Sequence, residues 1–274
     1  SRLKEIYDRP NVIYYKGRLP SDDVKSVAVV GSRNCSEYGR SVAMELGRVL
    51  ATAGAQVISG LALGIDVAAH QGAVLAGGTT FAVLAGGVDL CYPKQNFNTY
   101  VDIMRNGGVI SEFPDNTLTR PGMFPLRNRI ISGLCDAVII VEAGMKSGSL
   151  ITAAQALEQN RQVYAVPGRI GDGNSEGCNH LIWQGAQIVC SYDDLLAELD
   201  LDISDSTKTN EKNILLASDE KMLYSQLLDF SPKSLETLIK ETGMSQMQVF
   251  QALLTLELKG LIKEISKNFY IRIL

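Results

Sequence analysis

The chain has 274 residues, of which 46% are hydrophobic and 20% are charged, and its formal net charge is −4. This composition is typical of a folded protein with one sizeable α/β domain and a smaller second one. No apolar stretch approaches the ~20 residues that a membrane-spanning helix needs, so we expect no membrane partner. The negative charge excludes a protein that is basic all over, and a nucleic-acid site would need its cations gathered in one place.

The five cysteines are widely scattered and odd in number. None forms a Cys-x-x-Cys pair, so the pattern indicates neither a zinc site nor a disulfide framework. Free thiols are typical of a reducing compartment, and the N-terminus lacks the pattern of a signal peptide. We therefore expect a cytoplasmic protein without a metal site.

Short β-branched runs alternate with amphipathic segments from about Val24 to Leu199. The predicted strands are Ser26–Val30, Gln56–Ile58, Thr80–Leu84, Gly108–Ser111, Asp136–Val141, Gln162–Val166 and Gln187–Val189. The predicted helices include Gly39–Leu50, Asp66–Leu75 and Leu150–Gln159. Strands and helices in alternation, with almost purely apolar strands, predict an extended Rossmann-like, doubly wound and mostly parallel sheet covered by helices on both faces.

The composition becomes polar near Asp200. We expect a linker over residues 201–218, which separates a first domain, residues 1–200, from a second domain, residues 219–274. The predicted elements of the second domain are helices at Glu220–Leu228, Leu235–Thr242 and Ser245–Lys259 and a β-like stretch at Ile262–Ile273. Three helices followed by a small hairpin predict a winged-helix domain.

Four strand ends in the first domain are rich in glycine and serine. They are Gly31-Ser32-Arg33, the run Ser59–Gly64 with Gly60, Gly86-Gly87, and Ser147-Gly148-Ser149 preceded by Lys146. Ligands of open parallel sheets bind beyond the carboxyl ends of the strands, where glycine permits a close approach to the backbone. The helix that follows adds N–H groups and a partial positive charge. One such end is explained equally well as a tight turn, but the set predicts a site for phosphates.

The fingerprints of two common nucleotide sites are not present. Gly31 is followed only by Gly39, so there is no Gly-x-Gly-x-x-Gly motif after the first strand. The run Gly144–Ser149 lacks the residue order of a P-loop. We therefore expect no cofactor.

A second group of cations follows the strand predicted at Gly108–Ser111 and surrounds an aromatic ring. The cations are Arg120, Arg127 and Arg129, and Phe124 and Asn128 lie among them in the sequence. Arginine binds phosphate oxygens with two parallel hydrogen bonds, and Phe124 offers a face on which a base can stack. The alternative is structural, since such side chains often tie down neighbouring loops. We expect that role for at least one of residues 127–129, with Asp136 or Glu142 as its partner.

Candidates for catalysis are few. His70 and His180 fall in predicted helices, and we expect hydrogen-bonded core or interface residues at both positions. Asp66 is expected to be a carboxylate at the start of a helix, where it fixes the preceding turn. Neither metal-ligand spacing nor a Ser-His-Asp set is evident. We therefore predict that the protein has no catalytic residues and is not an enzyme.

Several stretches, taken in order, resemble the DprA/Smf family of bacterial DNA-processing proteins. They are Val29–Arg33, Ser59–Asp66, Tyr92–Asn96, Phe124–Ile131, Ser147–Thr152 and Ala165–Gly168. The resemblance covers roughly Asn11 to Leu199. It implies a protein that binds and protects incoming single-stranded DNA during natural transformation, loads the RecA recombinase onto it, and acts as a homodimer.

The resemblance also implies individual DNA contacts. Arg33 and Lys94 match two DNA-contacting positions of the family. A third family lysine stands just ahead of the Phe-Pro-x-Arg-Asn motif; Pro121 occupies that place here, and Arg120 lies one residue earlier. Leu63 stands where many members have a lysine, which removes one cation.

Many members of the family carry a helical N-terminal domain. Ser1–Lys16 resembles only the segment that leaves that domain. We therefore expect residues 1–23 to be a lead-in from a missing N-terminal helical domain.

The segment Cys178–Ala186 predicts a dimer interface at His180, Leu181, Ile182 and Trp183, the only tryptophan. A short helix cannot bury the last three beneath itself and still keep a polar face. Tryptophan is also enriched among the residues that dominate interfaces. The alternative is that Trp183 caps the edge of the sheet inside its own subunit, and the dimeric habit of the family favours the interface.

Two other functions are weighed against DNA binding. A Rossmann-like nucleotide-processing hydrolase of the lysine-decarboxylase-like type carries a Pro-Gly-Gly-x-Gly-Thr loop and a catalytic glutamate, an arrangement that Glu142–Ser149 does not show. A transcription factor would read a duplex through the winged helix, which needs a basic footprint. From Asp219 to Leu274, seven acids balance seven bases. We expect the second domain to contact protein, or DNA only weakly.

Overall fold

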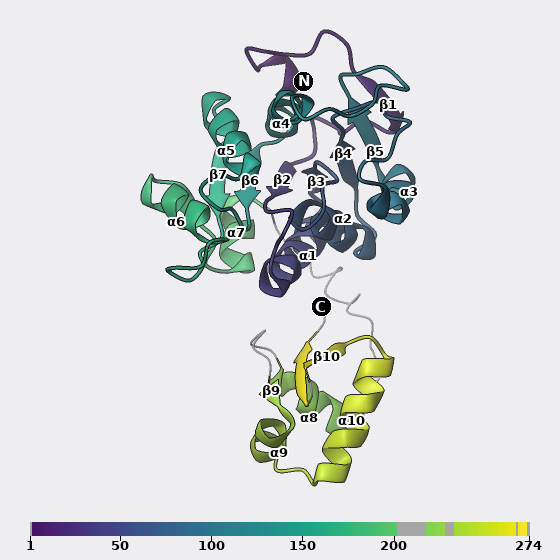
Figure 1. Ribbon diagram of the computed structural model, residues 1–274, viewed down its shortest axis with the longest axis vertical. Coiled ribbons are helices and arrows are strands. Elements are labelled where there is room, and N and C mark those ends of the chain that lie inside the picture. Colours follow the sequence, from purple (N-terminus) through teal and green to yellow (C-terminus); the bar gives the residue numbers. More distant parts are fainter. Residues whose placement is uncertain (1, 202–216, 228–232, 267, 273–274) are drawn as a thin grey trace. The chain divides into compact units, whose positions relative to one another are not determined.

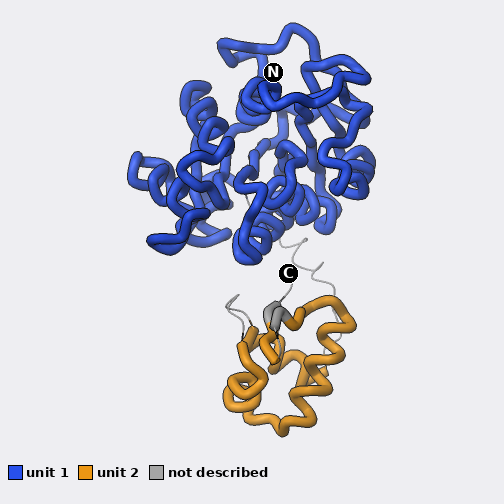
Figure 2. Tube along the Cα trace, in the orientation of Figure 1, with its two compact units in different colours: residues 1–204 blue, residues 205–274 orange. Residues whose placement is uncertain are grey.

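The computed structural model describes residues 2–201, 217–227, 233–266 and 268–272. The chain divides into two compact units, residues 1–204 and 205–274 (Figure 2). Each unit has a hydrophobic core of its own. Most of the linker predicted over residues 201–218 lies outside the described residues.

The first unit is built on an eight-stranded sheet with the strand order β1-β5-β4-β3-β2-β6-β7-β8 (Figure 1). The strands are β1 (Tyr14–Gly17), β2 (Ser26–Val30), β3 (Gln56–Ser59), β4 (Thr80–Val83), β5 (Gly108–Ser111), β6 (Ala137–Ile140), β7 (Gln162–Ala165) and β8 (Gln187–Ile188). Strands β2 to β8 pair in parallel, and β1 pairs antiparallel with β5 at one edge. The sheet is therefore mostly parallel, as predicted.

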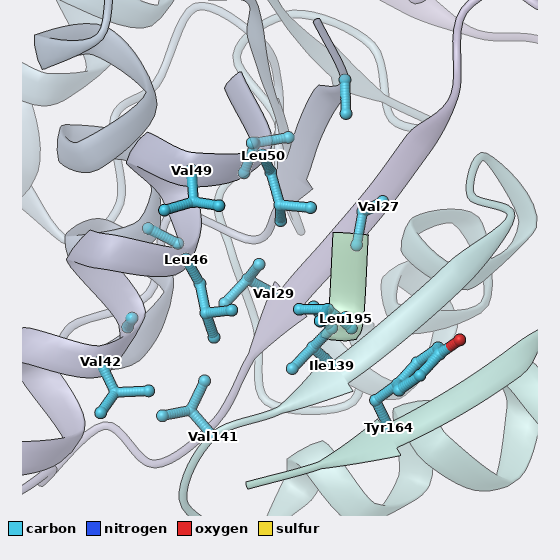
Figure 3. Packing of buried hydrophobic residues seen from close by; sticks show 14 of the residues in the cluster. Val27, Val29, Val42, Leu46, Val49, Leu50, Ile139, Val141, Tyr164 and Leu195 are labelled. Carbon is cyan, nitrogen blue, oxygen red and sulfur yellow. The ribbon is translucent and has the colours of Figure 1, made fainter. Parts of the chain in front are cut away.

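Helices cover both faces of this sheet. The helices of one face are α1 (Glu37–Thr52), α2 (Ile65–Leu75), α3 (Phe97–Asn106) and α7 (Tyr192–Glu198); those of the other are α4 (Met123–Gly133), α5 (Gly148–Glu158) and α6 (Glu176–Trp183). Successive side chains of a strand point to opposite faces. Thus Val27 and Val29 of β2 pack beneath α1 (Figure 3), whereas Ala28 and Val30 pack against the other layer. Both faces of β2 are buried, which explains its purely apolar sequence.

Helices α1 and α2 approach each other closely because each places a glycine at the contact. A Cβ atom at Gly47 would collide with the carbonyl oxygen of Ala69, and one at Gly72 with the carbonyl oxygen of Met44. The two backbones are therefore in direct contact at these positions.

The strand order reverses between β2 and β6. The chain runs outward from β2 through β3 and β4 to β5, then returns to place β6 beside β2 and continues to β7 and β8. At such a reversal the loops leave in opposite directions, and a crevice opens at the carboxyl ends of the strands. The loops after β2 and β6 flank this crevice.

The second unit has the winged-helix fold. Its elements are α8 (Ser218–Gln226), β9 (Lys233–Ser234), α9 (Leu235–Thr242), α10 (Gln246–Leu258), β10 (Ile262–Ser266) and β11 (Phe269–Arg272). Ser234 and Ser245 cap the starts of α9 and α10, and Gly243, with φ +67°, closes α9. The fold predicted for both parts of the chain is confirmed.

Candidate nucleic-acid interface

A cavity of about 460 Å³ lies at the reversal point of the first unit. Its walls come from the loop after β2, the start of α4, the loop between β6 and α5, and Asn174 beyond β7. A smaller cavity of about 70 Å³ adjoins it and shares Arg33, Ala62, Phe124 and Arg127 as walls. The site therefore lies at the place where α/β sheets of this kind bind ligands.

The larger cavity brings together ten of the residues that the sequence predicted for DNA binding. They are Gly31, Ser32, Arg33, Phe124, Arg127, Asn128, Lys146, Ser147, Gly148 and Ser149. Gly60 lines the smaller cavity. Lys94 and Arg120 are exposed and line neither, although Tyr92 and Pro93, just before Lys94, line the smaller one.

Arg33 and two aromatic rings adjoin one another at this site. The Arg33 guanidinium carbon lies 4.6 Å from the centre of the Phe124 ring. The Tyr92 ring lies 6.1 Å from the same ring, centre to centre. Proteins that bind single strands combine such elements, because a cation attracts the phosphate and a ring face stacks the base.

Arg127 lies inside the wall between the two cavities. Its Nη1 donates hydrogen bonds to the carbonyl oxygens of Gly60, at 2.7 Å, and Val83, at 2.5 Å. Burial lowers its pKa to about 10, with Asp66 opposing the shift and Arg33 adding to it, so the guanidinium is charged at neutral pH. A Cβ atom at Gly60 would collide with this guanidinium. Gly60 therefore makes room for a buried arginine.

Asp66 fixes the turn before α2, as the sequence predicted. Its Oδ2 accepts hydrogen bonds from the backbone N–H groups of Gly60, at 3.1 Å, and Ala62, at 3.4 Å. Burial raises the pKa of Asp66, against the lowering effects of Arg127 and these backbone donors. The carboxylate is the only acidic side chain in the wall of the larger cavity among the described residues.

Glu142, beyond the end of β6, holds the loop that carries Arg33. Its carboxylate accepts hydrogen bonds from the Ser36 backbone N–H, at 2.9 Å, and from the Ser36 hydroxyl, at 2.5 Å. Its main-chain carbonyl accepts one from the Ser32 N–H, at 2.7 Å. The loop is thus tied to β6 on both sides of Arg33.

Helix α5 begins at the larger cavity. The Ser147 hydroxyl caps the helix by accepting from the Ser149 N–H, and the two hydroxyls lie 2.7 Å apart. Asn128 donates to the carbonyl of Gly148 at 3.3 Å, which fixes the loop to α4. The first turn of a helix offers N–H groups and a partial positive charge to an anion, and Lys146 adds a full charge beside it.

Comparison with known proteins agrees with this architecture. A family model described as DNA recombination-mediator protein A matches residues 1–200, and one described as the DprA winged helix domain matches residues 208–266. This chain belongs to the DprA family. The DNA processing protein DprA of Streptococcus pneumoniae is 46% identical over 198 residues, which are 72% of this chain and 70% of that protein. Protein Smf of Escherichia coli is 35% identical over 276 residues, covering 98% and 73% of the two chains.

Two solved structures of DprA proteins resemble the chain in fold. The X-ray structure of Streptococcus pneumoniae DprA has a TM-score of 0.68 and 47% identity, over 72% of this chain and 69% of that one. DNA processing protein A of Helicobacter pylori has a TM-score of 0.67 and 29% identity, over 74% and 94%. The latter structure concerns a single-stranded DNA binding mode.

Arg129 has a structural role in this DprA-family chain. It pairs with Asp8, at 3.1 Å, and with Glu112, at 2.6 Å. One member of the group at 127–129 is thus structural, as predicted, but the partners predicted for it, Asp136 and Glu142, were wrong. Asp136 pairs instead with Arg2, at 2.8 Å. Successive residues of a helix are turned by about 100° around its axis, so Arg129 points away from the cavity that Arg127 and Asn128 line.

The predicted dimer segment lies on α6, where its side chains divide between core and surface. Trp183 is 80% exposed and stacks on His180, with ring centres 5.5 Å apart. It therefore does not cap the sheet edge of its own subunit. Leu181 is buried in the core of the first unit, which corrects its place in the predicted interface, and Ile182 is half-buried.

The described residues hold no group of three or more His, Cys, Asp or Glu side chains that could bind a metal ion. Within the same ranges, none of the helices combines the length and hydropathy needed to cross a membrane. His70 is buried in α2, where its Nδ1 lies 2.7 Å from the Thr80 hydroxyl, as expected of a core histidine.

Sequence reasoning missed three polar residues of the larger cavity: Asn34, Thr152 and Asn174. Asn174 donates to the carbonyl of Asn34 at 3.0 Å and thereby connects the loops after β7 and β2. Its loop follows a parallel strand, so the rule of strand ends pointed to it. The loop also holds Gly168, Arg169, Gly171, Gly173 and Ser175, so the glycine-rich signal used for the other strand ends was present here and was overlooked.

Proposed function

We propose that this DprA-family chain binds single-stranded DNA at the reversal point, with a phosphate in the larger cavity and a base against Phe124. The observation that carries the proposal is the position of Arg33 over the Phe124 ring at 4.6 Å. Arg33, Arg127 and Lys146 line the larger cavity together with a single carboxylate, Asp66. The site is therefore positive on a chain whose net charge is −4.

The proposed preference for single strands rests on access to the ring. In a duplex both faces of a base are stacked on its neighbours, whereas an unpaired base is free to stack on an aromatic side chain. Phosphate contacts are assigned to Arg33 and Lys146 and to the backbone at Gly31, Ser32 and Ser147–Ser149. Exposed Lys94 and Arg120 extend the path of the strand beyond the cavities. Arg127, Asn128 and Gly60 shape the walls.

The finer role that we propose is to protect incoming DNA during natural transformation and to load RecA onto it. The matching family model, which describes a recombination mediator, supports a role in recombination. We also propose a cytoplasmic homodimer, which the exposed Trp183 supports.

The test of DNA binding is the electrophoretic mobility of labelled oligonucleotides of one sequence, single-stranded and duplex, with the pure protein. The single strand should shift at a lower protein concentration, and its affinity should fall as salt rises because counterions are released. Equal affinity for the two forms, or an affinity insensitive to salt, would contradict the proposal.

Catalytic turnover forms no part of the proposed function. Incubation with nucleoside monophosphates, nucleotide cofactors or DNA should release no product that chromatography detects. Product release that follows the protein through purification and disappears in a cavity variant such as Ser149→Ala would overturn this part of the proposal.

A further inference from the structure

The two sides of the larger cavity differ, and the order of the strands defines them. On the side of β3 and β4 it adjoins the smaller cavity, whose walls continue past Phe124 to Tyr92, just before the exposed Lys94. On the other side of β2 lie β6 and β7 (Figure 1), and the loops after these two strands complete the wall. A single strand with a base against Phe124 therefore enters from the side of β4 and runs towards β6.

Contacts between three loops close the side at β6 and β7. The Asn174 side chain, beyond β7, donates to the carbonyl of Asn34, beyond β2, at 3.0 Å. The Asn174 carbonyl accepts a hydrogen bond from the N–H of Ala143, beyond β6, at 2.7 Å. A Cβ atom at Gly144 would lie 3.1 Å from the carbonyl oxygen of Gly173, so the loops after β6 and β7 also approach closely there. The three loops are thus joined where a strand would have to leave the cavity.

Donors without partners line the same cavity. Arg127 is 4% exposed, and its Nε has no hydrogen-bond acceptor among the described residues. Thr152 of α5 is 1% exposed, and its hydroxyl makes no hydrogen bond within the same ranges. Unpartnered buried polar groups are rare in folded proteins because they cost free energy. These donors therefore indicate an anion that accepts several hydrogen bonds at once.

The charge of the cavity fits a phosphate with two negative charges. Arg33, Arg127 and Lys146 bring three positive charges to the walls and Asp66 brings one negative charge, which leaves two positive charges. A phosphate inside a strand carries one negative charge. A terminal phosphate carries about 1.5 to 2 at neutral pH, because its second pKa is near 6, and it has three free oxygens. The terminal phosphate therefore matches both the charge and the number of donors better.

We propose that the larger cavity binds the phosphorylated end of a single strand, with the terminal phosphate at the start of α5. This inference rests on the proposed function and adds that the cavity holds the end of a strand rather than its middle. The strand then leaves over Phe124 towards Lys94. A terminus held in this way is covered, so an exonuclease cannot reach it, which is one physical route to the proposed protection of DNA.

The experiment measures the affinity of the full chain for four short single strands of one sequence, by fluorescence anisotropy of an internal label. One strand carries a 5′ phosphate, one carries a 3′ phosphate, one has hydroxyl groups at both ends, and one is closed into a circle. At least one phosphorylated strand should bind about tenfold more tightly than the strand with hydroxyl ends, because it adds charge-assisted hydrogen bonds. The circle, which has internal phosphates only, should bind no more tightly than the strand with hydroxyl ends.

Two variants and a competitor locate the terminal phosphate. Lys146→Ala should reduce the tenfold ratio to less than about threefold, because the charge beside the phosphate is lost. The control, Lys16→Ala on the exposed edge strand β1, should leave the ratio unchanged. Thymidine monophosphate, added at the concentration of the phosphorylated strand, should not displace it, because the mononucleotide lacks the contacts along the path to Lys94.

The outcomes separate this proposal from the proposed function. Equal affinity for the three linear strands, with salt-sensitive binding intact, would overturn the strand end and leave single-strand binding in place. A full ratio in Lys146→Ala, or displacement by thymidine monophosphate at equal concentration, would also overturn it, since the phosphate would lie elsewhere or the ligand would be a free nucleotide. Failure to bind any of the four strands would contradict the proposed function and this inference together.

Discussion

Arg33 differs from the other arginines of the site in what surrounds its charge. Arg127 donates to main-chain carbonyls, and Arg129 pairs with two carboxylates. Arg33 is exposed and lies over the Phe124 ring, an arrangement that leaves its donors directed at solvent or at a ligand. Arg127 and Arg129 are thus held by acceptors within the protein, whereas Arg33 is the arginine that we propose as a contact of the ligand.

Reversal of this charge, Arg33→Glu, should weaken single-strand binding at least about tenfold for oligonucleotides of any sequence. The slope of log affinity against log salt should become shallower by about 0.7, because one phosphate contact is lost. Arg105→Glu, on the surface of α3, is the matched control and should bind as the parent does. Fluorescence anisotropy at several salt concentrations measures both quantities. An unchanged affinity would remove Arg33 from the site.

The substitution Glu142→Ala should loosen the loop of Arg33 without touching the ligand. It leaves the Ser36 N–H and hydroxyl without their buried acceptor, which costs about 1–3 kcal/mol in the free energy of unfolding. Single-strand affinity of the folded variant should fall as well, because Arg33 is no longer held. Glu158→Ala, an exposed residue of α5, should change neither the urea midpoint nor the affinity. Loss of stability with full affinity would show that the clamp does not position Arg33.

At the scale of the elements, burial decides which of them the sequence reveals. Strands β2 to β8 follow from apolar runs, and their ends agree with the predicted ones to within one residue. The edge strand β1 was not predicted, because its four residues are exposed and show no alternation. Helix α4 was obscured by Pro125, which reads as a break in the sequence but is tolerated in the first turn, where N–H groups lack helical acceptors.

The rule that ligands of parallel sheets bind beyond the carboxyl ends of the strands also located most of the site. It could not separate Arg33 from Arg127, since that distinction depends on carbonyls of Gly60 and Val83 that lie far away in the sequence. It could not find Glu142 as the clamp of Ser36 for the same reason. Side-chain roles within the site are set by partners that only the folded chain brings together.

Helix α2 and strand β4 are joined by His70, which should make stability depend on pH. Burial, together with the charge of Arg127, lowers the pKa of His70 to about 3 from an ordinary 6.5. Between these values the unfolded chain holds a proton that the folded chain does not, so stability decreases as the pH falls from 6.5, by up to about 1.4 kcal/mol per unit.

The substitution His70→Gln should flatten this dependence, measured as the free energy of urea unfolding at pH 7, 6 and 5. The comparison uses the slope with pH, because the substitution also changes stability by altering the core. His180→Gln removes the other histidine and should keep the parental slope. Identical slopes in the parent and His70→Gln would refute the assignment.

At the scale of the whole molecule, the exposed Trp183 leads to a test of the proposed dimer. The pair of changes Trp183→Ala and Ile182→Glu should halve the molar mass in light scattering. Binding to long oligonucleotides should weaken while binding to short ones stays nearly unchanged, because two linked sites gain avidity only on a long strand. Ile170→Glu, on a fully exposed residue of the same unit, is the control. An intact dimer in the double variant would place the interface elsewhere.

The glycine contact between α1 and α2 has a genetic consequence. Helix α1 follows the loop of Arg33, and α2 follows the turn that holds Gly60, so the spacing of the two helices sets the spacing of two walls of the site. Any side chain at Gly47 or Gly72 must force the helices apart. A random-mutagenesis screen for loss of the proposed single-strand binding should therefore recover alleles at these two codons, and an allele map alone would mistake a buried helix crossing for a surface that touches DNA.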